Sequence, residues 1–266
     1  MPAVTIEDIE MTYTDEGSGS AVVFVHGYPF NRSLWNEQVA ALVGNHRTIV
    51  PDLRGFGETG TGDVPATMSQ MARDLKLLLD HLEIEKALIA GLSMGGYVTL
   101  AFYKEFGARV RGLLLANTRA GQDSDEAKTS RREQAEKALT EGMAGIADSM
   151  LPKLLTPETV SRKPDLVKRI RDMMLKTNPK GAAAALLGMA SREDFTNELN
   201  KISLPVLIIA GRDDALIPMQ HSEKMHEAIP NSRLAVIDHA AHVVNLEQAE
   251  AFNREMTLFV TQLNSW

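Results

Sequence analysis

The chain has 266 residues, with 28 lysines and arginines against 35 aspartates and glutamates, and it contains no cysteine. Without cysteine, disulfides, thiolate zinc sites, iron–sulfur clusters and thiol nucleophiles are excluded. The formal net charge of −7 argues against a nucleic-acid partner, because such surfaces normally carry a basic excess. No apolar run approaches the ~18 residues of a membrane span, and the first residues lack the features of a secretory signal. We therefore expect a cytoplasmic globular protein with no membrane partner.

Short apolar runs alternate with helical patterns along the chain. Residues 4–13 alternate in the manner of strands, and residues 21–25 form a continuous apolar run, as expected of a strand buried on both faces. Thr67 and Gln70 form a capping-box pattern ahead of apolar residues at helical spacing. Further strand-like runs cover residues 47–51, 87–90, 113–116, 205–210 and 234–237. This alternation predicts an α/β fold with a mostly parallel central sheet flanked by helices.

The strand pattern is interrupted between residues 119 and 201. Charged helical stretches occupy this segment, and prolines are predicted to separate them. These prolines are Pro152, Pro157, Pro164 and Pro179. The methionines of the segment are expected to fill helix cores rather than to line a pocket. We interpret the segment as an inserted helical cap, which divides the chain into a core at 1–118, a cap at 119–201 and a second part of the core at 202–266.

The motif Gly91–Gly95, which reads Gly-Leu-Ser-Met-Gly, lies between a predicted buried strand and a predicted helix. A serine at such a sharp turn is tolerated because the glycines two residues away avoid side-chain clashes. The turn presents the Ser93 hydroxyl at a helix N-terminus, where free N–H groups favour developing negative charge. Ser93 is therefore the candidate nucleophile.

A serine nucleophile needs a base, and two of the seven histidines are candidates. His239 and His242 both follow the last predicted strand, at the end where an open α/β sheet presents its ligand groups. A carboxylate that orients the histidine is expected after the preceding strand, where Asp213 and Asp214 occur. Position alone leaves the choice open within each pair.

Five motifs together resemble the α/β-hydrolase superfamily, and they span nearly the whole chain. They are His26-Gly27-Tyr28-Pro29, Asp52-x-Arg54-Gly55-x-Gly57, Gly91-x-Ser93-x-Gly95-Gly96, Gly211-x-x-Asp214-x-x-Ile217-Pro218, and Ala241-His242 before Leu246-Glu247. In that family the acid ends the Gly-x-x-Asp motif, which implies Asp214, and the histidine just before the final helices implies His242. The chain most resembles the small capped carboxylesterases and the 3-oxoadipate enol-lactonase-like hydrolases. Serine at position 93 distinguishes it from the haloalkane dehalogenases and epoxide hydrolases.

The resemblance implies a serine hydrolase that cleaves small carboxylic esters or lactones through an acyl-enzyme, with Ser93, Asp214 and His242 as the catalytic triad. The backbone N–H groups of Tyr28 and Met94 would form the oxyanion hole, and no metal or organic cofactor would be needed. Three alternatives use the same fold. They are a cofactor-free perhydrolase or haloperoxidase, a carbon–carbon bond hydrolase, and a small-molecule receptor without catalysis.

Two aromatic residues follow the predicted oxyanion loop. Phe30 and Trp35 are expected to line a substrate pocket next to Ser93. The predicted cap is poor in aromatic residues, which favours a small or medium aliphatic acyl group. No apolar stripe of the sequence predicts an oligomeric state.

Overall fold

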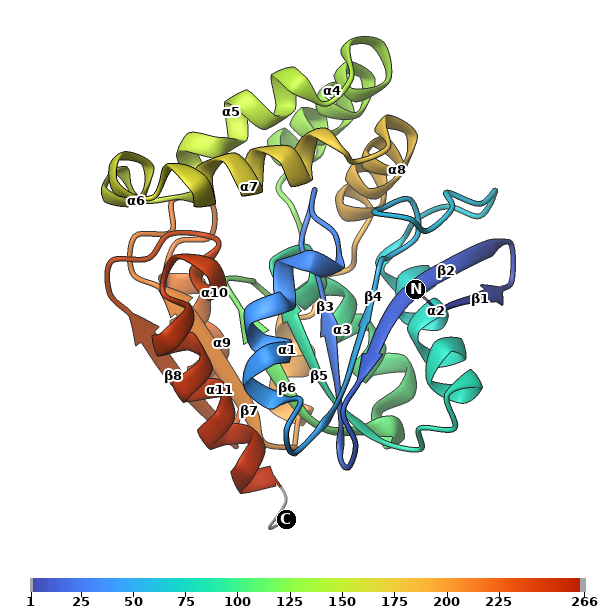
Figure 1. The fold of residues 1–266 in the computed structure, drawn as a ribbon, viewed down its shortest axis with the longest axis vertical. Helices are drawn as coiled ribbons and strands as arrows, with labels where there is room; N and C mark the ends of the chain where they lie inside the picture. The colour runs from blue at the N-terminus through green and yellow to red at the C-terminus, as the bar shows by residue number, and fades with distance from the viewer. Residues whose placement is uncertain (1, 264–266) are drawn as a thin grey trace.

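The computed structural model describes residues 2–263, so residues 1 and 264–266 of the predicted core lie outside the described residues. Within this range the sheet has eight strands in the order β1-β2-β4-β3-β5-β6-β7-β8. The pairs from β4 to β8 are parallel, whereas β2 runs antiparallel to both of its neighbours. The strands are β1 (Ala3–Ile6), β2 (Ile9–Glu16), β3 (Ala21–Val25), β4 (Arg47–Pro51), β5 (Ala87–Leu92), β6 (Val110–Ala116), β7 (Val206–Gly211) and β8 (Ser232–Ile237). The predicted α/β class is confirmed (Figure 1).

The first strand-like stretch of the sequence is a hairpin. Strands β1 and β2 pair with Ile6 opposite Ile9, and Glu7 takes a positive φ of 48° in the turn. The Asp8 carboxylate stabilises this turn by accepting the N–H groups of Asp63 and Val64 at 2.6 and 2.8 Å. Because the polar–apolar alternation continues through both strands, and because the turn lacks glycine or asparagine, the sequence does not reveal the reversal.

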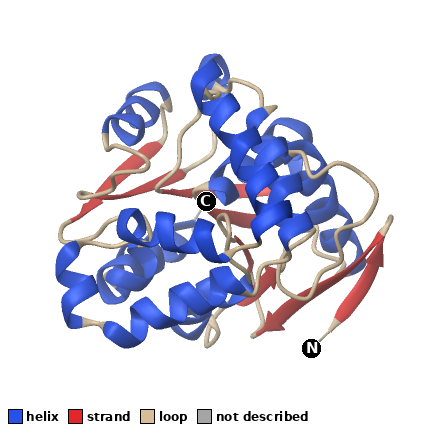
Figure 2. Ribbon diagram, turned by 90° about the horizontal axis from the view of Figure 1, so that it is seen from above, coloured by secondary structure: helices blue, strands red, loops and turns tan. Residues whose placement is uncertain are grey.

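Helices cover both faces of the sheet because alternate side chains of each strand point to opposite sides. Val23 and Ile89 contribute to the core that includes α2, α3 and α9, whereas Val22 and Phe24 contribute to the core that includes α1 and α11. Figure 2 shows the strands between the two helical layers. The helices are α1 (Asn36–Leu42), α2 (Met68–His81), α3 (Met94–Phe106), α9 (Gln220–Ala228), α10 (Val244–Glu247) and α11 (Ala249–Leu263), with 3-10 turns η1 (Arg32–Trp35) and η2 (Gly107–Arg109).

The segment between β6 and β7 is helical and lies over the carboxyl ends of the parallel strands (Figure 1). It contains α4 (Asp125–Glu141), α5 (Ala144–Leu154), α6 (Pro157–Arg162), α7 (Pro164–Leu175), α8 (Pro179–Ala190) and the 3-10 turn η3 (Thr196–Lys201). Pro157, Pro164 and Pro179 each begin a helix, where the fixed φ of proline suits the first turn. Pro152 was wrongly predicted as a separator, since it lies in the last turn of α5. None of the helices in residues 2–263 is long and apolar enough to cross a membrane.

Candidate active site

Ser93 lies at a strained turn between β5 and α3. Its φ is +56° and its ψ is −115°, a conformation that a non-glycine residue rarely adopts. The backbone is held on both sides, because the Ser93 N–H donates to the carbonyl of Ala116 at 2.9 Å and the Thr118 hydroxyl donates to the carbonyl of Ser93 at 2.8 Å. The nucleophile candidate is therefore fixed by the end of the neighbouring strand β6.

The two glycines of the motif allow the backbone to pack closely at this turn. A Cβ atom at Gly91 would lie 2.3 Å from the carbonyl oxygen of Gly95, and a Cβ atom at Gly95 would lie 2.1 Å from the carbonyl oxygen of Val25. Both distances are far below van der Waals contact, and the atoms met are backbone atoms that cannot rotate away. The sequence pattern around Ser93 thus has a steric cause in the packing of α3 against β3.

Replacement of Gly95 by alanine is expected to destabilise the protein, because α3 must then move away from β3. Overpacking of this kind typically costs about 1–3 kcal/mol in the free energy of unfolding. Gly145→Ala is the matched control, because a Cβ atom at Gly145 meets nothing within 4 Å in helix α5. Urea unfolding of the two variants measures the difference, and an equal change in both would contradict the steric explanation.

A buried histidine–carboxylate pair lies beside this turn. Nδ1 of His242 is 2.8 Å from Oδ2 of Asp214, and the two side chains are 3% and 0% exposed. The other carboxylate oxygen of Asp214 accepts the N–H groups of Leu216 and Ile217 at 2.8 and 3.0 Å. Because a carboxylate can only accept, Nδ1 carries the proton of the neutral ring, and Nε2 is left as an acceptor.

The competing residues of each predicted pair lie elsewhere. The Asp213 side chain is exposed, whereas its backbone N–H donates to the carbonyl of Ala240. His239 is also exposed and lines a separate cavity beside Thr156 and Lys163. The structure therefore brings Asp214 and His242 together and leaves Asp213 and His239 outside the pair.

Asn117 joins the two loops that carry this pair. Its Nδ2 donates to the carbonyl oxygens of Ala241 and His242 at 2.8 and 2.7 Å, and its Oδ1 accepts the N–H of Gly211 at 2.8 Å. Sequence reasoning did not identify this positioning role. The sequence signal for this role was an amide side chain directly after strand β6. This strand lies between β5 and β7, the strands that lead to Ser93 and Asp214.

Glu247 connects the histidine loop to the helical segment above the sheet. One carboxylate oxygen accepts the N–H of Ala241 at 2.6 Å, and the other accepts the N–H and the hydroxyl of Thr156 at 2.8 and 2.9 Å. Thr156 is the N-cap of α6. The position of the loop before His242 is therefore coupled to the start of this helix.

The loop after β3 packs directly on the Ser93 turn. A Cβ atom at Gly27 would lie 3.3 Å from the Cβ atom of Ser93, so this position leaves little room for a side chain. His26 holds the loop, since its Nε2 accepts the N–H of Leu53 at 3.0 Å and its Nδ1 lies 3.0 Å from the carbonyl oxygen of Gly27. Burial lowers the pKa of His26, which agrees with a neutral ring that accepts at Nε2 and donates at Nδ1.

Ser93 and His242 both line a cavity of about 290 Å³, and Tyr28 lines it as well. Met150 and Met189 are also in its wall. Both side chains pack with the hydrophobic core as expected, and Met189 is only 2% exposed, so these two methionines contribute to the core and to the cavity wall. The wall is completed by residues of α4, α5 and α8. The helical segment between β6 and β7 thus covers the candidate site.

Phe30 and Trp35 do not line this cavity, which corrects the expectation from the sequence. Both side chains are 0% exposed and belong to the core on the α1 and α11 face of the sheet. The ring of Trp35 packs against the rings of Phe24 and Phe252, with centroid distances of 4.9 and 5.9 Å. The loop after β3 places Phe30 in this core, and the 3-10 turn η1 that follows places Trp35 there.

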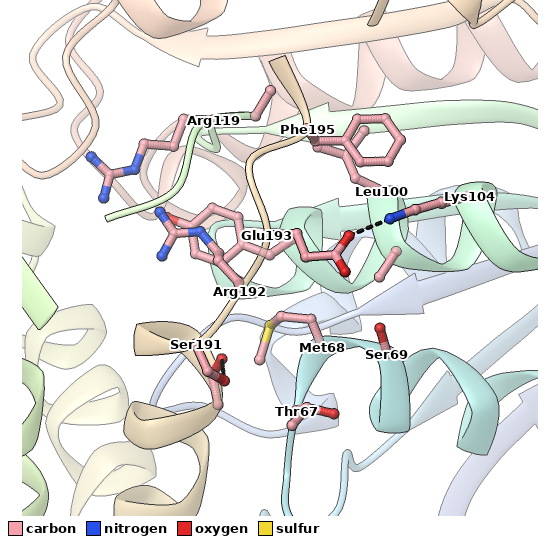
Figure 3. A pocket seen from close by; sticks show the side chains of 14 residues that line it. Thr67, Met68, Ser69, Leu100, Lys104, Arg119, Ser191, Arg192, Glu193 and Phe195 are labelled. Carbon is pink, nitrogen blue, oxygen red and sulfur yellow. Dashed lines mark hydrogen bonds and ion pairs between the residues drawn. The ribbon is translucent and has the colours of Figure 1, made fainter. Parts of the chain in front are cut away.

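A second cavity of about 230 Å³ lies between α2, α3 and the end of α8. Figure 3 shows the guanidinium groups of Arg119 and Arg192 on one side of it, and Lys104 paired with Glu193 on another. The Arg192 guanidinium stacks over the ring of Tyr97 at 4.2 Å. Because Tyr97 and Arg119 line both cavities, these side chains form the partition between them.

The comparison with known proteins gives the family. A family profile described as the alpha/beta hydrolase fold matches residues 20–249. The chain belongs to this family.

In residues 2–263, no cluster of three or more histidine, aspartate or glutamate side chains is arranged to hold a metal ion.

The relatives of this hydrolase include lactonases and esterases. It is 29% identical to 3-oxoadipate enol-lactonase 2 of Acinetobacter baylyi, over 98% of this chain and 97% of the relative. A thermophilic esterase of Thermogutta terrifontis, solved with malate bound, superimposes with a TM-score of 0.97 at 40% identity, over 99% of each chain. The enol-lactonase of Burkholderia xenovorans superimposes with a TM-score of 0.92 at 31% identity, over 98% of this chain and all of the neighbour. The predicted membership and the prediction of an enzyme are therefore confirmed.

Proposed function

We propose that this hydrolase cleaves carboxylic esters or lactones with Ser93 as nucleophile, His242 as general base and Asp214 as the acid that orients the histidine. The observation that carries the proposal is the buried 2.8 Å hydrogen bond between Asp214 and His242 at the wall of the cavity that Ser93 also lines. The esterase and lactonase relatives support the same reaction class.

The reaction has two steps. His242 Nε2 takes the proton of the Ser93 hydroxyl as its oxygen attacks the ester carbonyl, and the same proton passes to the leaving alcohol. A water molecule then loses a proton to His242 and attacks the acyl-enzyme, which releases the acid and restores Ser93. Asp214 stabilises the imidazolium that forms in each step.

The negative charge on the tetrahedral oxygen needs hydrogen-bond donors. We assign the backbone N–H groups of Tyr28 and Met94 to this role. The assignment is supported by the close packing of Gly27 on the Ser93 turn and by the position of Met94 as the first residue of α3. One such donor typically contributes about 2.7–4 kcal/mol of transition-state stabilisation.

In this proposal residues 119–201, which contain the helices between β6 and β7, form a cap over the site. Support comes from Ser130 on α4, Met150 on α5 and Met189 on α8, which all line the cavity with Ser93. The cap side chains would then select among substrates, while the sheet edge supplies the reacting groups.

The proposal predicts an acyl-enzyme, which a stopped-flow experiment detects. Mixing with a 4-nitrophenyl ester should give a burst of 4-nitrophenolate that approaches one equivalent of enzyme when deacylation is slower than acylation. A fluorophosphonate probe should label Ser93, because it reacts with an activated serine. His242→Ala should prevent both events and His239→Ala should prevent neither, since only His242 contacts Asp214. Labelling that survives in His242→Ala would contradict the role of this histidine.

A further inference from the structure

The wall of the catalytic cavity carries more positive than negative charge. Arg119, Arg131 and Lys153 line it, and Asp123 is the one carboxylate among the lysine, arginine, aspartate and glutamate residues that do so in the described chain. The surplus is two positive charges, although the whole chain has a net charge of −7. Positive charge is therefore concentrated at the cavity against the overall balance of the protein.

The Asp123 carboxylate is shared by three arginines, so it cannot neutralise all of them. It is 2% exposed and makes ion pairs with Arg119, Arg131 and Arg192. Burial by itself would raise the pKa of Asp123, but hydrogen bonds from Arg192 and Arg131 outweigh this effect and lower the pKa to about 2. The carboxylate is thus ionised, and it holds the arginines in place at the cavity wall.

Two of the three arginines, Arg192 and Arg131, differ in how many of their terminal nitrogens already donate hydrogen bonds. Arg192 uses both terminal nitrogens, which donate to Asp123 and to the carbonyl oxygens of Met189 and Gly121. Arg131 contacts Asp123 through Nε alone, and in the described part of the chain its two terminal nitrogens donate no further hydrogen bond. A guanidinium held at Nε in this way presents its remaining N–H groups as a planar fork that matches a carboxylate.

Two further donors at the same cavity lack a partner within residues 2–263. Tyr28 is only 5% exposed, and its hydroxyl group makes no hydrogen bond. Burial raises the pKa of Tyr28 and the positive charge of Arg131 lowers it, with burial the larger effect, so the phenol stays protonated as a donor. Lys153 lines the cavity without an ion pair to the described residues. The Tyr28 hydroxyl is a buried donor without an acceptor, which is costly, and a ligand that supplies the acceptor removes this cost. Lys153 is exposed, and it contributes a positive charge at the cavity.

We propose that the cavity takes esters or lactones that carry a second, free carboxylate, and that Arg131, Lys153 and the Tyr28 hydroxyl bind this carboxylate. The inference rests on the proposed hydrolysis at Ser93 and specifies its substrate class. The cap would then select an anionic substrate through α4 and α5, which carry Arg131 and Lys153. An uncharged aliphatic ester would leave these donors unpaired.

Two methyl esters of equal length test the preference. Monomethyl adipate and methyl hexanoate differ in having a carboxylate or a methyl group at the far end. We expect kcat/KM to be at least about tenfold higher for monomethyl adipate, as for a charge-assisted hydrogen bond that is made only with the anion. Equal values, or a preference for methyl hexanoate, would overturn the proposal.

Variants locate the preference in the cap. Arg131→Gln and Lys153→Met should each lower the ratio of the two kcat/KM values several-fold. Arg132→Gln is the matched control, because Arg132 is the next residue on α4 and is exposed outside the cavity wall. Lys153 is exposed, so its replacement keeps the test valid if Arg131→Gln fails to fold. An unchanged ratio in both folded cap variants would overturn the assignment.

A binding measurement separates this inference from the proposed reaction. Calorimetric titration of the Ser93→Ala protein with glutarate should show binding that Arg131→Gln weakens about tenfold or more. Inorganic phosphate that binds as tightly as glutarate would overturn the assignment to a carboxylate. If methyl hexanoate is hydrolysed without a gain for monomethyl adipate, the carboxylate site fails alone. If neither ester is hydrolysed and Ser93 is not labelled, the proposed function fails. Glutarate binding that Arg131→Gln weakens would then still support the carboxylate site, and its absence would overturn it.

Discussion

Replacement of Ser93 by alanine is expected to lower kcat for ester hydrolysis by a factor on the order of 10⁶, as for the loss of the nucleophile in other serine hydrolases. In the proposed reaction the hydroxyl oxygen becomes bonded to the acyl group, so no acyl-enzyme can form without it. Alanine keeps the Cβ atom of serine, and the strained turn with φ of +56° should therefore tolerate the change as well as serine does. The loss should be chemical and not structural.

The measurement compares kcat on a 4-nitrophenyl ester with the unfolding free energy of the same preparation. Ser161→Ala is a suitable control, because Ser161 is exposed on α6 and does not line the cavity. We expect the unfolding free energy of Ser93→Ala to remain within about 0.5 kcal/mol of the unmodified protein, as for a substitution without a cavity or a lost buried partner. Retention of ester turnover, with traces of unmodified enzyme excluded, would contradict the assignment of the nucleophile.

Asp214→Asn is expected to reduce kcat by about 10⁴-fold, through the tautomer of His242. In the structure, Oδ1 of Asp214 accepts the N–H groups of Leu216 and Ile217, and Oδ2 accepts from His242. An asparagine will place its oxygen toward the two N–H groups and its amide nitrogen toward the histidine. Because this nitrogen is a donor, Nδ1 of His242 must accept, and the ring proton moves to Nε2. A protonated Nε2 cannot take the proton of the Ser93 hydroxyl.

The adjacent aspartate provides the matched control. Asp213→Asn makes the same chemical change one residue away, on an exposed side chain that does not contact His242. We expect its kcat to stay within about twofold of the unmodified enzyme, because a change of surface charge at this distance is screened by solvent. Steady-state kinetics on one ester compares kcat of the two variants. Equal losses of kcat would contradict the assignment of Asp214 as the orienting acid.

Local patterns in the sequence were sufficient for most of the core. The apolar runs at 21–25, 87–90 and 205–210 coincide with strands β3, β5 and β7, because a strand buried on both faces requires continuous apolar residues. Ser93 of the Gly91–Gly95 motif was placed correctly between β5 and α3, since the flanking periodicities are those of a strand and a helix. The first hairpin was not resolved, because its turn at Glu7 and Asp8 contains no glycine or asparagine.

Those patterns do not predict in which direction a side chain points when it follows a strand. Phe30 and Trp35 follow the predicted oxyanion loop in the sequence, and proximity along the chain suggested a pocket wall. Both rings instead belong to the core between the sheet and helices α1 and α11. A burial preference indicates that an aromatic side chain is enclosed, but it does not indicate on which side of the backbone.

By itself, the sequence determined the fold class, the family and the position of a serine at a strand-to-helix turn, because each of these depends on residues that are neighbours in the chain. Only the tertiary structure showed Asp214 against His242, Asn117 bonded to two loops, and three arginines around Asp123. These contacts join residues from different strand ends and different helices, and Asn117 and His242 are separated by 125 positions. Packing of the whole chain sets such contacts, and they decide which carboxylate lies against the histidine and which charge lines the cavity.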